Sequence, residues 1–367
     1  MESSDCNEPG GALCESTPAT FRRPKTSRGR SQSLFGLVRN GGLTPNGAMT
    51  RKKSSRKVVL AKVTRRQARK SEKRGRSAAT DLLLGAHVSI AGGTHEAPAR
   101  AKAIGATAMQ IFTKMAQRWA ERSCADDECL DFRRALAETK VRATVAHDSY
   151  LINLASPDPT LRRRSIESFV AELVRCEALG LHFLVSHPGN YIDDRERGLQ
   201  RNADAITEAL ERVPGRTMLC MELTSGSGTA IGSSFEELAS LIERVAPAVR
   251  ARMGVCVDTC HAYSAGYDLV KDYDGVWRHF GDVIGIERLR VLHLNDSKTP
   301  FASRRDRHEL IGEGSLGPAP FRRIMTDERM VEIPKLIETP KLDDATKTDS
   351  RMLARLRRYA AGSPRGA

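Results

Sequence analysis

The chain of 367 residues is 40% hydrophobic, which is enough to build the core of one large domain or two ordinary ones. No run of 18 apolar residues occurs, and acidic residues occupy positions 2, 5 and 8, so neither a membrane span nor a signal peptide is expected. The eight cysteines follow no disulfide-framework spacing and are expected to be reduced, intracellular thiols.

The formal net charge of +14 lies entirely in the first fifth of the chain. Residues 1–80 contain 19 Lys and Arg and 5 Asp and Glu, whereas residues 81–367 contain 40 of each sign. The first segment buries too little apolar surface to offset chain entropy, so we expect a disordered basic extension. It is either a dispensable solvated extension or a nuclear-import signal that also tethers nucleic acid through counterion release. We expect a nuclear location, with the mitochondrion and the cytoplasm as alternatives.

Eight short apolar runs repeat from Asp81 onward, each followed by a loop and a longer amphipathic stretch. The runs are rich in Val, Ile and Leu and do not alternate with polar residues, which is typical of parallel strands buried on both faces. Eight such units in about 280 residues predict an α/β fold, a (β/α)8 TIM barrel over residues 81–367. An open doubly wound sheet is the alternative, but no Gly-rich phosphate-binding turn follows the first strand. The expected strands cover residues 82–88, 108–114, 142–148, 182–188, 217–223, 252–258, 289–295 and 334–339.

Helical patterns occupy the segments between the strands. Residues 158–180 begin with a good capping sequence and end at Gly180, which predicts one long helix. Residues 233–250 show a second helical pattern.

The last residues of the expected strands have side chains of the kinds that bind metals. In a barrel these carboxyl ends meet at one face, where active sites lie. A single His at a strand end is more often a packed or capping residue, but four His and three carboxylates at one mouth would be costly to bury without cations. Imidazole mixed with carboxylate favours zinc or manganese, and the candidates outnumber the ligands of one ion. The eight residues are His87, Thr113, His147, His187, Glu222, Asp258, His293 and Glu338, of which Thr113 alone is not of this kind.

Two further segments add candidates for a separate ion. In DRHELIGEG, Asp306 and His308 are two residues apart, so their side chains point the same way on an extended segment. In VCVDTCHAY, His261 follows Asp258 by three residues and lies beyond the main group. The two cysteines of this stretch are not expected to be ligands, the first because it fills the sixth strand as an apolar residue.

Clustered cations at a barrel mouth suit the hydrolysis of phosphoesters. They lower the pKa of a water, polarise the phosphoryl oxygen and stabilise the entering and leaving oxygens. Here Glu222 would bridge two ions and Glu338 would position the water. A metal-dependent sugar isomerase or epimerase is the alternative, but it would leave His261, Asp306 and His308 without a role. A non-catalytic nucleic-acid-binding module would explain the basic extension but not the ligand-type residues.

Seven motifs match those of one known family in order and spacing. They are GAHVSIAGG, HDSYLINL, HPG, DTCHAYSAGYD, HLNDSK, DRHELIGEG and IETPK, and they extend over about residues 82–357. The chain thereby resembles the endonuclease IV family, the zinc-dependent apurinic/apyrimidinic (AP) endonucleases of base-excision repair. The resemblance implies hydrolysis of the phosphodiester 5′ of an abasic site in double-stranded DNA to leave a 3′-hydroxyl, and removal of blocking groups from 3′ ends. We expect a monomer without a membrane partner.

The family pattern also implies three zinc ions per chain. It gives catalytic roles to Glu222, which bridges two ions, and to Glu338, near which the attacking water is held. His87 matches no ligand of the pattern and is expected beside the ligands or on the phosphate side. The implied ligands are His147, His187 and Glu222 for the first ion, Glu222, Asp258, His293 and Glu338 for the second, and His261, Asp306 and His308 for the third.

The resemblance further implies residues that contact DNA. The motif HDSYL implies that Tyr150 and Leu151 insert into the gap left by the expelled abasic nucleotide, with local packing at the barrel rim as the alternative. The family loop after the second strand carries an inserted Arg, whereas FTKMAQRW has Gln117 at that position and Arg118 one later. Either Arg118 takes over this role or expulsion depends more on Tyr150. An abasic site lowers the cost of unstacking, which adds selectivity.

The charge distribution leads to a prediction about DNA binding. Deletion of residues 1–80 should leave turnover at saturating DNA unchanged, because all the ligand-type residues lie beyond the deletion. It should flatten the dependence of the dissociation constant on salt, because fewer counterions are released. Titration with abasic duplex at several salt concentrations measures this slope. An unaltered slope would reduce the segment to a targeting signal or a mere extension.

Overall fold

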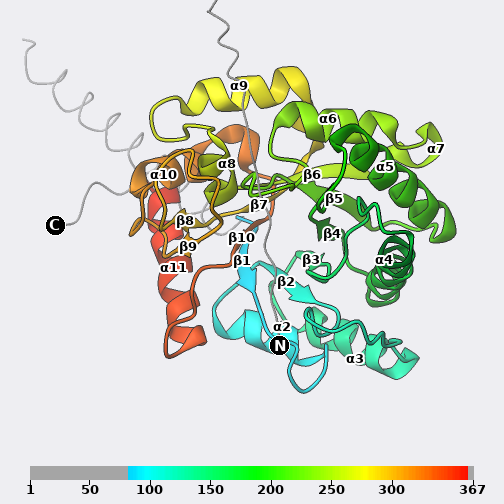
Figure 1. Cartoon of the computed structure of the whole chain (residues 1–367). Coiled ribbons are helices and arrows are strands. Elements are labelled where there is room, and N and C mark those ends of the chain that lie inside the picture. Colours follow the sequence, from blue (N-terminus) through cyan, green and yellow to red (C-terminus); the bar gives the residue numbers. More distant parts are fainter. Residues whose placement is uncertain (1–81, 363–367) are drawn as a thin grey trace, which may run out of the picture. The chain divides into compact units, whose positions relative to one another are not determined.

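The computed structural model describes residues 82–362, and within them eight parallel strands form a closed barrel (Figure 1). The predicted TIM barrel is therefore confirmed, while the expected extension over residues 1–80 lies outside the described residues. Around the barrel the strands follow the order β1-β10-β7-β6-β5-β4-β3-β2. The bounds of each strand lie within a few residues of those expected from the sequence. They are β1 (Leu84–His87), β2 (Ala108–Phe112), β3 (Ala143–His147), β4 (Phe183–Ser186), β5 (Met218–Glu222), β6 (Met253–Asp258), β7 (Leu289–His293) and β10 (Lys335–Ile337).

Helices lie around the outside of the barrel, and none of the described helices is long and apolar enough to cross a membrane (Figure 1). A two-stranded ribbon, β8 (Asp296–Ser297) with β9 (His308–Glu309), follows β7. The α-helices are α2 (Glu96–Ala103), α3 (Asp126–Ala137), α4 (Pro159–Leu179), α5 (Arg195–Arg212), α6 (Phe235–Arg244), α7 (Pro247–Arg250), α8 (Thr259–Ala265), α9 (Tyr273–Val283), α10 (Pro318–Thr326) and α11 (Ala345–Ala360), with short 3₁₀ turns at Ile286–Arg288 and Glu328–Met330.

One of the two expected helices forms as predicted and the other is divided. Asp158 caps α4 by accepting hydrogen bonds from the backbone N–H groups of Thr160 and Leu161, and Gly180 ends it in a left-handed conformation at φ 73°. The helical pattern over residues 233–250 is confirmed, but it corresponds to two helices rather than one. Proline disfavours helical geometry in the residue before it, and Ala246 accordingly has a ψ of 135°. The segment therefore forms α6 and then the short α7.

The barrel interior is packed solid below the mouth. Buried apolar side chains from the strands form a cluster inside the barrel, which we call the apolar floor. The polar residues at the carboxyl ends of the strands lie above it. Cys256 belongs to this floor, as expected for an apolar filler. The residues of the floor are Ala108, Ala143, Val145, Val185, Cys220, Cys256, Val291 and Leu336.

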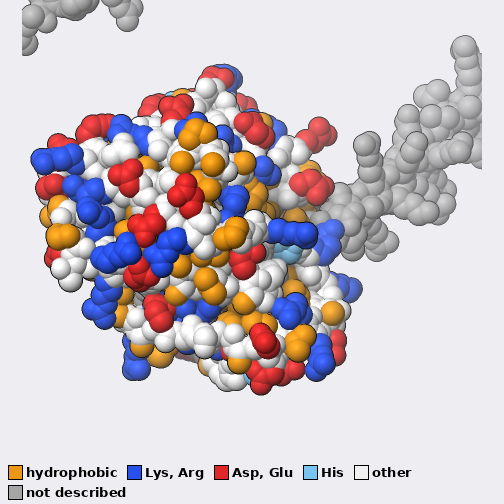
Figure 2. Space-filling view, turned by 90° about the vertical axis from the view of Figure 1, so that its right-hand side faces the viewer, with side chains coloured by type: hydrophobic (Ala, Val, Ile, Leu, Met, Phe, Trp, Pro, Cys, Tyr) orange, Lys and Arg blue, Asp and Glu red, His pale blue; other side chains and the backbone are white. Residues whose placement is uncertain are grey.

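Charges of both signs are interspersed on the outer face drawn in Figure 2. Arg212 of α5, for example, pairs with Glu167 of α4 at 2.7 Å and with Glu208 one turn earlier in α5 at 3.0 Å. Such exposed pairs each contribute little to stability. This face has the balanced charge expected for residues 81–367.

Candidate metal centre

The carboxyl ends of the strands bring the predicted ligands together at one mouth. His147, Glu222, Asp258 and His293 are the last residues of β3, β5, β6 and β7. Parallel pairing holds these ends side by side, since Asp258 is directly opposite His293 in the β6–β7 register. We describe the ligand-type side chains as three groups. In the first two, the ligand atoms lie within 4.8 Å of one another. The third, His261, Asp306 and His308, is linked by contacts of both imidazoles with Asp306.

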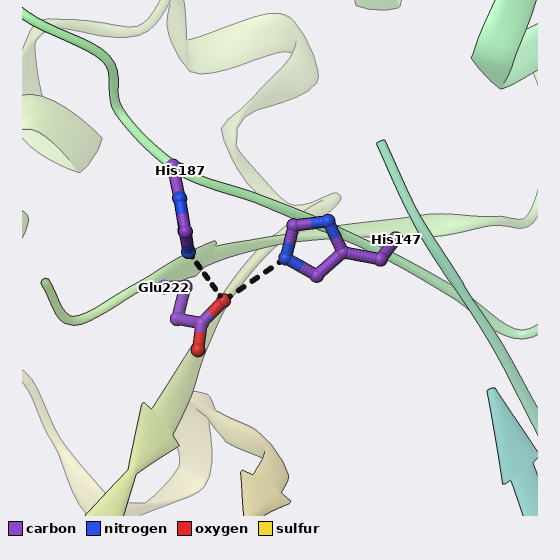
Figure 3. Close-up of side chains that lie close together, drawn as sticks. All are labelled: His147, His187 and Glu222. Carbon is purple, nitrogen blue, oxygen red and sulfur yellow. Dashed lines mark hydrogen bonds and ion pairs between the residues drawn. The ribbon is translucent and has the colours of Figure 1, made fainter. Parts of the chain in front are cut away.

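The first group consists of His147, His187 and Glu222 (Figure 3). Nε2 of His147 lies 3.2 Å from Oε2 of Glu222, and Nε2 of His187 lies 3.1 Å from the same oxygen. Nδ1 of His147 lies 2.9 Å from the backbone oxygen of Asp148 and donates to it, which leaves Nε2 free to face the group.

The second group uses the other oxygen of Glu222, together with Asp258, His293 and Glu338. Nδ1 of His293 lies 2.9 Å from Oε1 of Glu222 and 3.4 Å from Oε2 of Glu338. The two oxygens of one buried carboxylate thus face two different groups. This is the geometry that a bridging ligand requires.

The third group lies where β6 passes into α8 and beside the ribbon β8–β9, whose second strand contains His308. Asp258 ends β6 and caps α8, because its Oδ1 accepts a hydrogen bond from the backbone N–H of His261 at 2.9 Å. Nε2 of His261 lies 3.2 Å from Oδ2 of Asp306, and Nε2 of His308 lies 3.1 Å from Oδ1 of Asp306. The three-residue spacing from Asp to His is therefore that of a helix cap, which turns the two side chains toward neighbouring groups.

Asp258, which the family pattern assigns to the second ion, also lies close to the third group. Its Oδ2 is 3.7 Å from Nε2 of His308, and Asp258, His261 and His308 together form one of the clusters of ligand atoms. Cys260 is also near, since its Sγ lies within 4.8 Å of ligand atoms of Asp306 and His308. Burial raises the pKa of Cys260 to about 11, so its side chain is a neutral thiol.

The charges in the mouth stabilise one another. Burial opposes the charged form of His147, but its hydrogen bond with Glu222 and the nearby carboxylates outweigh burial and raise its pKa to about 10. Burial likewise opposes the charged form of His308, and Asp258 and Asp306 raise its pKa to about 9. Protons therefore occupy imidazole positions that a cation would take over.

The donor set fits divalent cations. Nε2 of His308 is buried and makes no hydrogen bond among the described residues, although it lies 3.1 Å from Asp306. A buried ring nitrogen that faces carboxylates without a hydrogen bond is costly unless a proton or a metal cation lies between them. The imidazole and carboxylate donors around it suit transition-metal ions. The roles of the individual residues as ligands stay a prediction.

Two buried amides connect the ligands and were missed in the sequence. Gln110 of β2 contacts Glu338 and His293, while Asn295 donates to Oδ2 of Asp258 at 2.6 Å and accepts from the backbone N–H of Glu338 at 2.8 Å. The signal for Gln110 was a polar side chain inside an apolar run. His87 also lies beside a ligand, with Nδ1 3.7 Å from Oε1 of Glu338, in agreement with its expected place.

The residues expected to contact DNA lie at the rim. The side chain of Tyr150 is 60% exposed, and its ring stands edge-on to Phe112 at 5.3 Å, so the residue both packs locally and presents a surface to solvent. Leu151 is half-buried, whereas Gln117 and Arg118 are exposed on the loop after β2. Nζ of Lys114 donates to the backbone oxygen of Arg118 at 3.1 Å and anchors this loop. Contact with DNA stays a prediction.

Comparison with known proteins gives a consistent assignment. A family model described as xylose isomerase-like TIM barrel matches residues 98–356. A protein named probable endonuclease 4 from Halorhodospira halophila is 43% identical over 260 residues, which covers 69% of this chain and 86% of that protein. The crystal structure of endonuclease IV from Thermus thermophilus has 33% identity and a TM-score of 0.68, and the match covers 76% of this chain and 99% of that one.

A likeness to sugar-converting enzymes extends to the fold alone. The crystal structure of 3-keto-D-glucoside 4-epimerase from E. coli is 14% identical with a TM-score of 0.54, over 75% of this chain and 99% of that one. The relatives with over 40% identity are instead named endonuclease 4. The chain therefore belongs to the endonuclease IV family and is a hydrolytic nuclease built on a TIM barrel.

Proposed function

We propose that this enzyme cleaves double-stranded DNA at abasic sites during base-excision repair. It hydrolyses the phosphodiester 5′ of the site, leaves a 3′-hydroxyl, removes blocking groups from 3′ ends, and acts as a monomer. The observation that carries the proposal is the third group of His261, Asp306 and His308 beside the two groups bridged by Glu222. A two-ion sugar isomerase has no use for that third group.

The proposed cofactor is three zinc ions per chain. The first group, the second group and the third group would each hold one ion, with Glu222 shared between the first two. Mixed nitrogen and oxygen ligands suit zinc better than calcium or magnesium. When bound, the ions would polarise the phosphoryl oxygen and lower the pKa of the attacking water.

Glu338 is the residue proposed to hold the attacking water. Burial opposes its ionised form, but the nearby His293 outweighs burial and holds its pKa well below the usual range. Its Oε1 accepts a hydrogen bond from the Gln110 amide at 2.6 Å, which leaves Oε2 to orient the water. An ionised carboxylate in this position would accept a hydrogen bond from the water and orient it toward the phosphorus.

The rim residues are proposed to hold the distorted DNA. Tyr150 and Leu151 would fill the space left by the expelled abasic nucleotide, and Gln117 or Arg118 would enter the same gap. The anchored loop after β2 presents both of the latter side chains to solvent. Because an abasic nucleotide has no base to unstack, its expulsion costs less than that of an intact nucleotide.

A cleavage assay tests the proposal. The substrate is a 5′-labelled duplex with one tetrahydrofuran residue, which mimics an abasic site and cannot undergo β-elimination. We expect a single cut on the 5′ side of the analogue, with a product that a DNA polymerase extends directly, and no cut in an intact duplex. No cleavage, or a product that the polymerase cannot extend, would overturn the proposal.

A further inference from the structure

We propose that Gln110 is a positioning residue that determines which atoms of His293 and Glu338 face the second group. Gln110 lies within β2, the strand whose end carries no ligand-type residue, and its side chain is fully buried. A buried amide within an apolar strand is costly unless all of its hydrogen-bonding capacity is used. The inference rests on the metal binding proposed above.

The amide of Gln110 uses its oxygen and its nitrogen on three different strands. Its Oε1 lies 2.8 Å from Nε2 of His293 in β7. Its Nε2 lies 2.6 Å from Oε1 of Glu338, directly after β10, and 3.0 Å from Nδ1 of His87 in β1. One acceptor and two donor hydrogens are thus matched by three partners.

The orientation of this amide follows from the chemistry of its partners. An ionised carboxylate only accepts hydrogen bonds, so the NH₂ group must face Glu338 and the oxygen must face His293. Rotation of the amide by half a turn would place its oxygen against the carboxylate. The buried contacts therefore hold one orientation.

That orientation in turn determines which ring nitrogen of His293 carries the hydrogen. Because Gln110 presents an oxygen, Nε2 of His293 must donate, and a neutral imidazole then has no hydrogen on Nδ1. Nδ1 lies 2.9 Å from Oε1 of Glu222 and 3.4 Å from Oε2 of Glu338, so its lone pair points into the second group. At the same time Oε1 of Glu338 is occupied, which leaves Oε2 for the group.

The other histidines show why His293 needs such a partner. Nδ1 of His147 and of His261 lies 2.9 Å and 3.0 Å from a backbone carbonyl oxygen. Nε2 of each lies beside a carboxylate of the site, that of Glu222 for His147 and that of Asp306 for His261. The ring of His293 is reversed, with Nδ1 in the site. Its Nε2, which points away from the site, donates to Oε1 of Gln110. Gln110 thus supplies the acceptor that a backbone carbonyl supplies to His147 and His261.

Replacement of Gln110 by Met, which has similar length and no hydrogen-bonding groups, tests the inference in the full-length protein. Loss of a hydrogen-bond partner behind a metal ligand typically weakens metal binding about 10- to 100-fold. We therefore expect Gln110→Met to release part of its Zn²⁺ at a chelator concentration about 10- to 100-fold lower than the wild type does. Elemental analysis after dialysis against a chelator series measures the release.

Thr144→Val is the matched control, because Thr144 is buried in the neighbouring strand and bonds to His182 outside the three groups. It should lower the melting temperature and leave Zn²⁺ retention unchanged. If Gln110→Met retained Zn²⁺ as well as the wild type does, the role of Gln110 would be overturned, but the proposed metal centre would not. A wild-type protein that retains no Zn²⁺ would overturn both the inference and the proposed metal centre.

A second measurement needs no variant. In protein with ¹⁵N-labelled histidine, the side-chain shifts of His293 should show the hydrogen on Nε2 and none on Nδ1 when Zn²⁺ is bound. A hydrogen on Nδ1 would overturn the inference even if Gln110→Met failed to fold.

Discussion

Replacement of Glu222 by Gln should lower kcat/KM on an abasic duplex by about 10³-fold or more, because metal ions supply several kcal/mol of transition-state stabilisation and each 1.4 kcal/mol is about tenfold in rate. Oε2 of Glu222 faces His147 and His187, while its Oε1 lies 2.9 Å from His293 and 3.3 Å from His261. Gln has the same shape but no negative charge to balance cations in two groups. We therefore expect metal content and cleavage to fall together.

The control for Glu222→Gln is Glu237→Gln. Glu237 is also a buried carboxylate, but it pairs with Arg195 and accepts from the backbone N–H of Ser233 just before α6, and it belongs to none of the three groups. That variant should be less stable and still cleave abasic duplex with wild-type metal content. Full cleavage by Glu222→Gln with an unchanged metal content would contradict the bridging role of Glu222.

Protein stripped of cations should lose stability as the pH rises from about 6.5, the ordinary pKa of His in the unfolded chain, to about 10, the pKa of His147 in the folded protein. Burial alone would lower this pKa, but the hydrogen bond with Glu222 raises it above the unfolded value. Stability from the charged imidazole is therefore complete below pH 6.5 and is lost as the pH approaches 10. At about 1.4 kcal/mol per pKa unit, the loss amounts to several kcal/mol.

The proton on His147 must leave before Zn²⁺ binds, so the affinity for Zn²⁺ should depend on pH. A ligand imidazole must be neutral, so the affinity for Zn²⁺ should rise about tenfold per pH unit for each proton that binding releases. In His147→Asn the slope should be lower by one proton, whereas His182→Asn, whose ring bonds to Thr144 outside the mouth, should leave the slope unchanged. Chelator competition at a series of pH values measures both slopes.

Two results would contradict this account of the metal centre. One is an affinity for Zn²⁺ that does not change with pH. The other is prompt recovery of cleavage on addition of Mg²⁺ alone to the stripped protein, which would exclude a tightly held zinc cluster.

The barrel could be predicted from the sequence because its signals are local. A parallel strand covered on both faces must be apolar nearly throughout, so eight runs of Val, Ile and Leu mark eight strands without knowledge of their neighbours. The carboxyl ends of parallel strands share one face, and His147, Glu222, Asp258 and His293 could therefore be placed together in advance. Long helix α4 was equally readable from Asp158 and Gly180, which bond within their own turns.

Contacts between strands that are far apart in the chain could not be predicted in this way. Gln110 and Glu338 are separated by 228 residues and meet because β1, which pairs with β2 on one side and β10 on the other, closes the barrel between them. A polar residue inside an apolar run does not by itself indicate its partners. The placement of Asp258 between the second and third groups likewise depends on where the ribbon β8–β9 places His308.

The sequence by itself thus determined the barrel architecture, the histidines and carboxylates gathered at its mouth, and the helix cap that links Asp258 to His261, since each depends on the periodicity of a strand or on one helical turn. Only the tertiary structure decided which atom of each ligand faces which group. That choice depends on ring orientations and amide contacts set by barrel closure and strand register, and these are properties of the whole sheet.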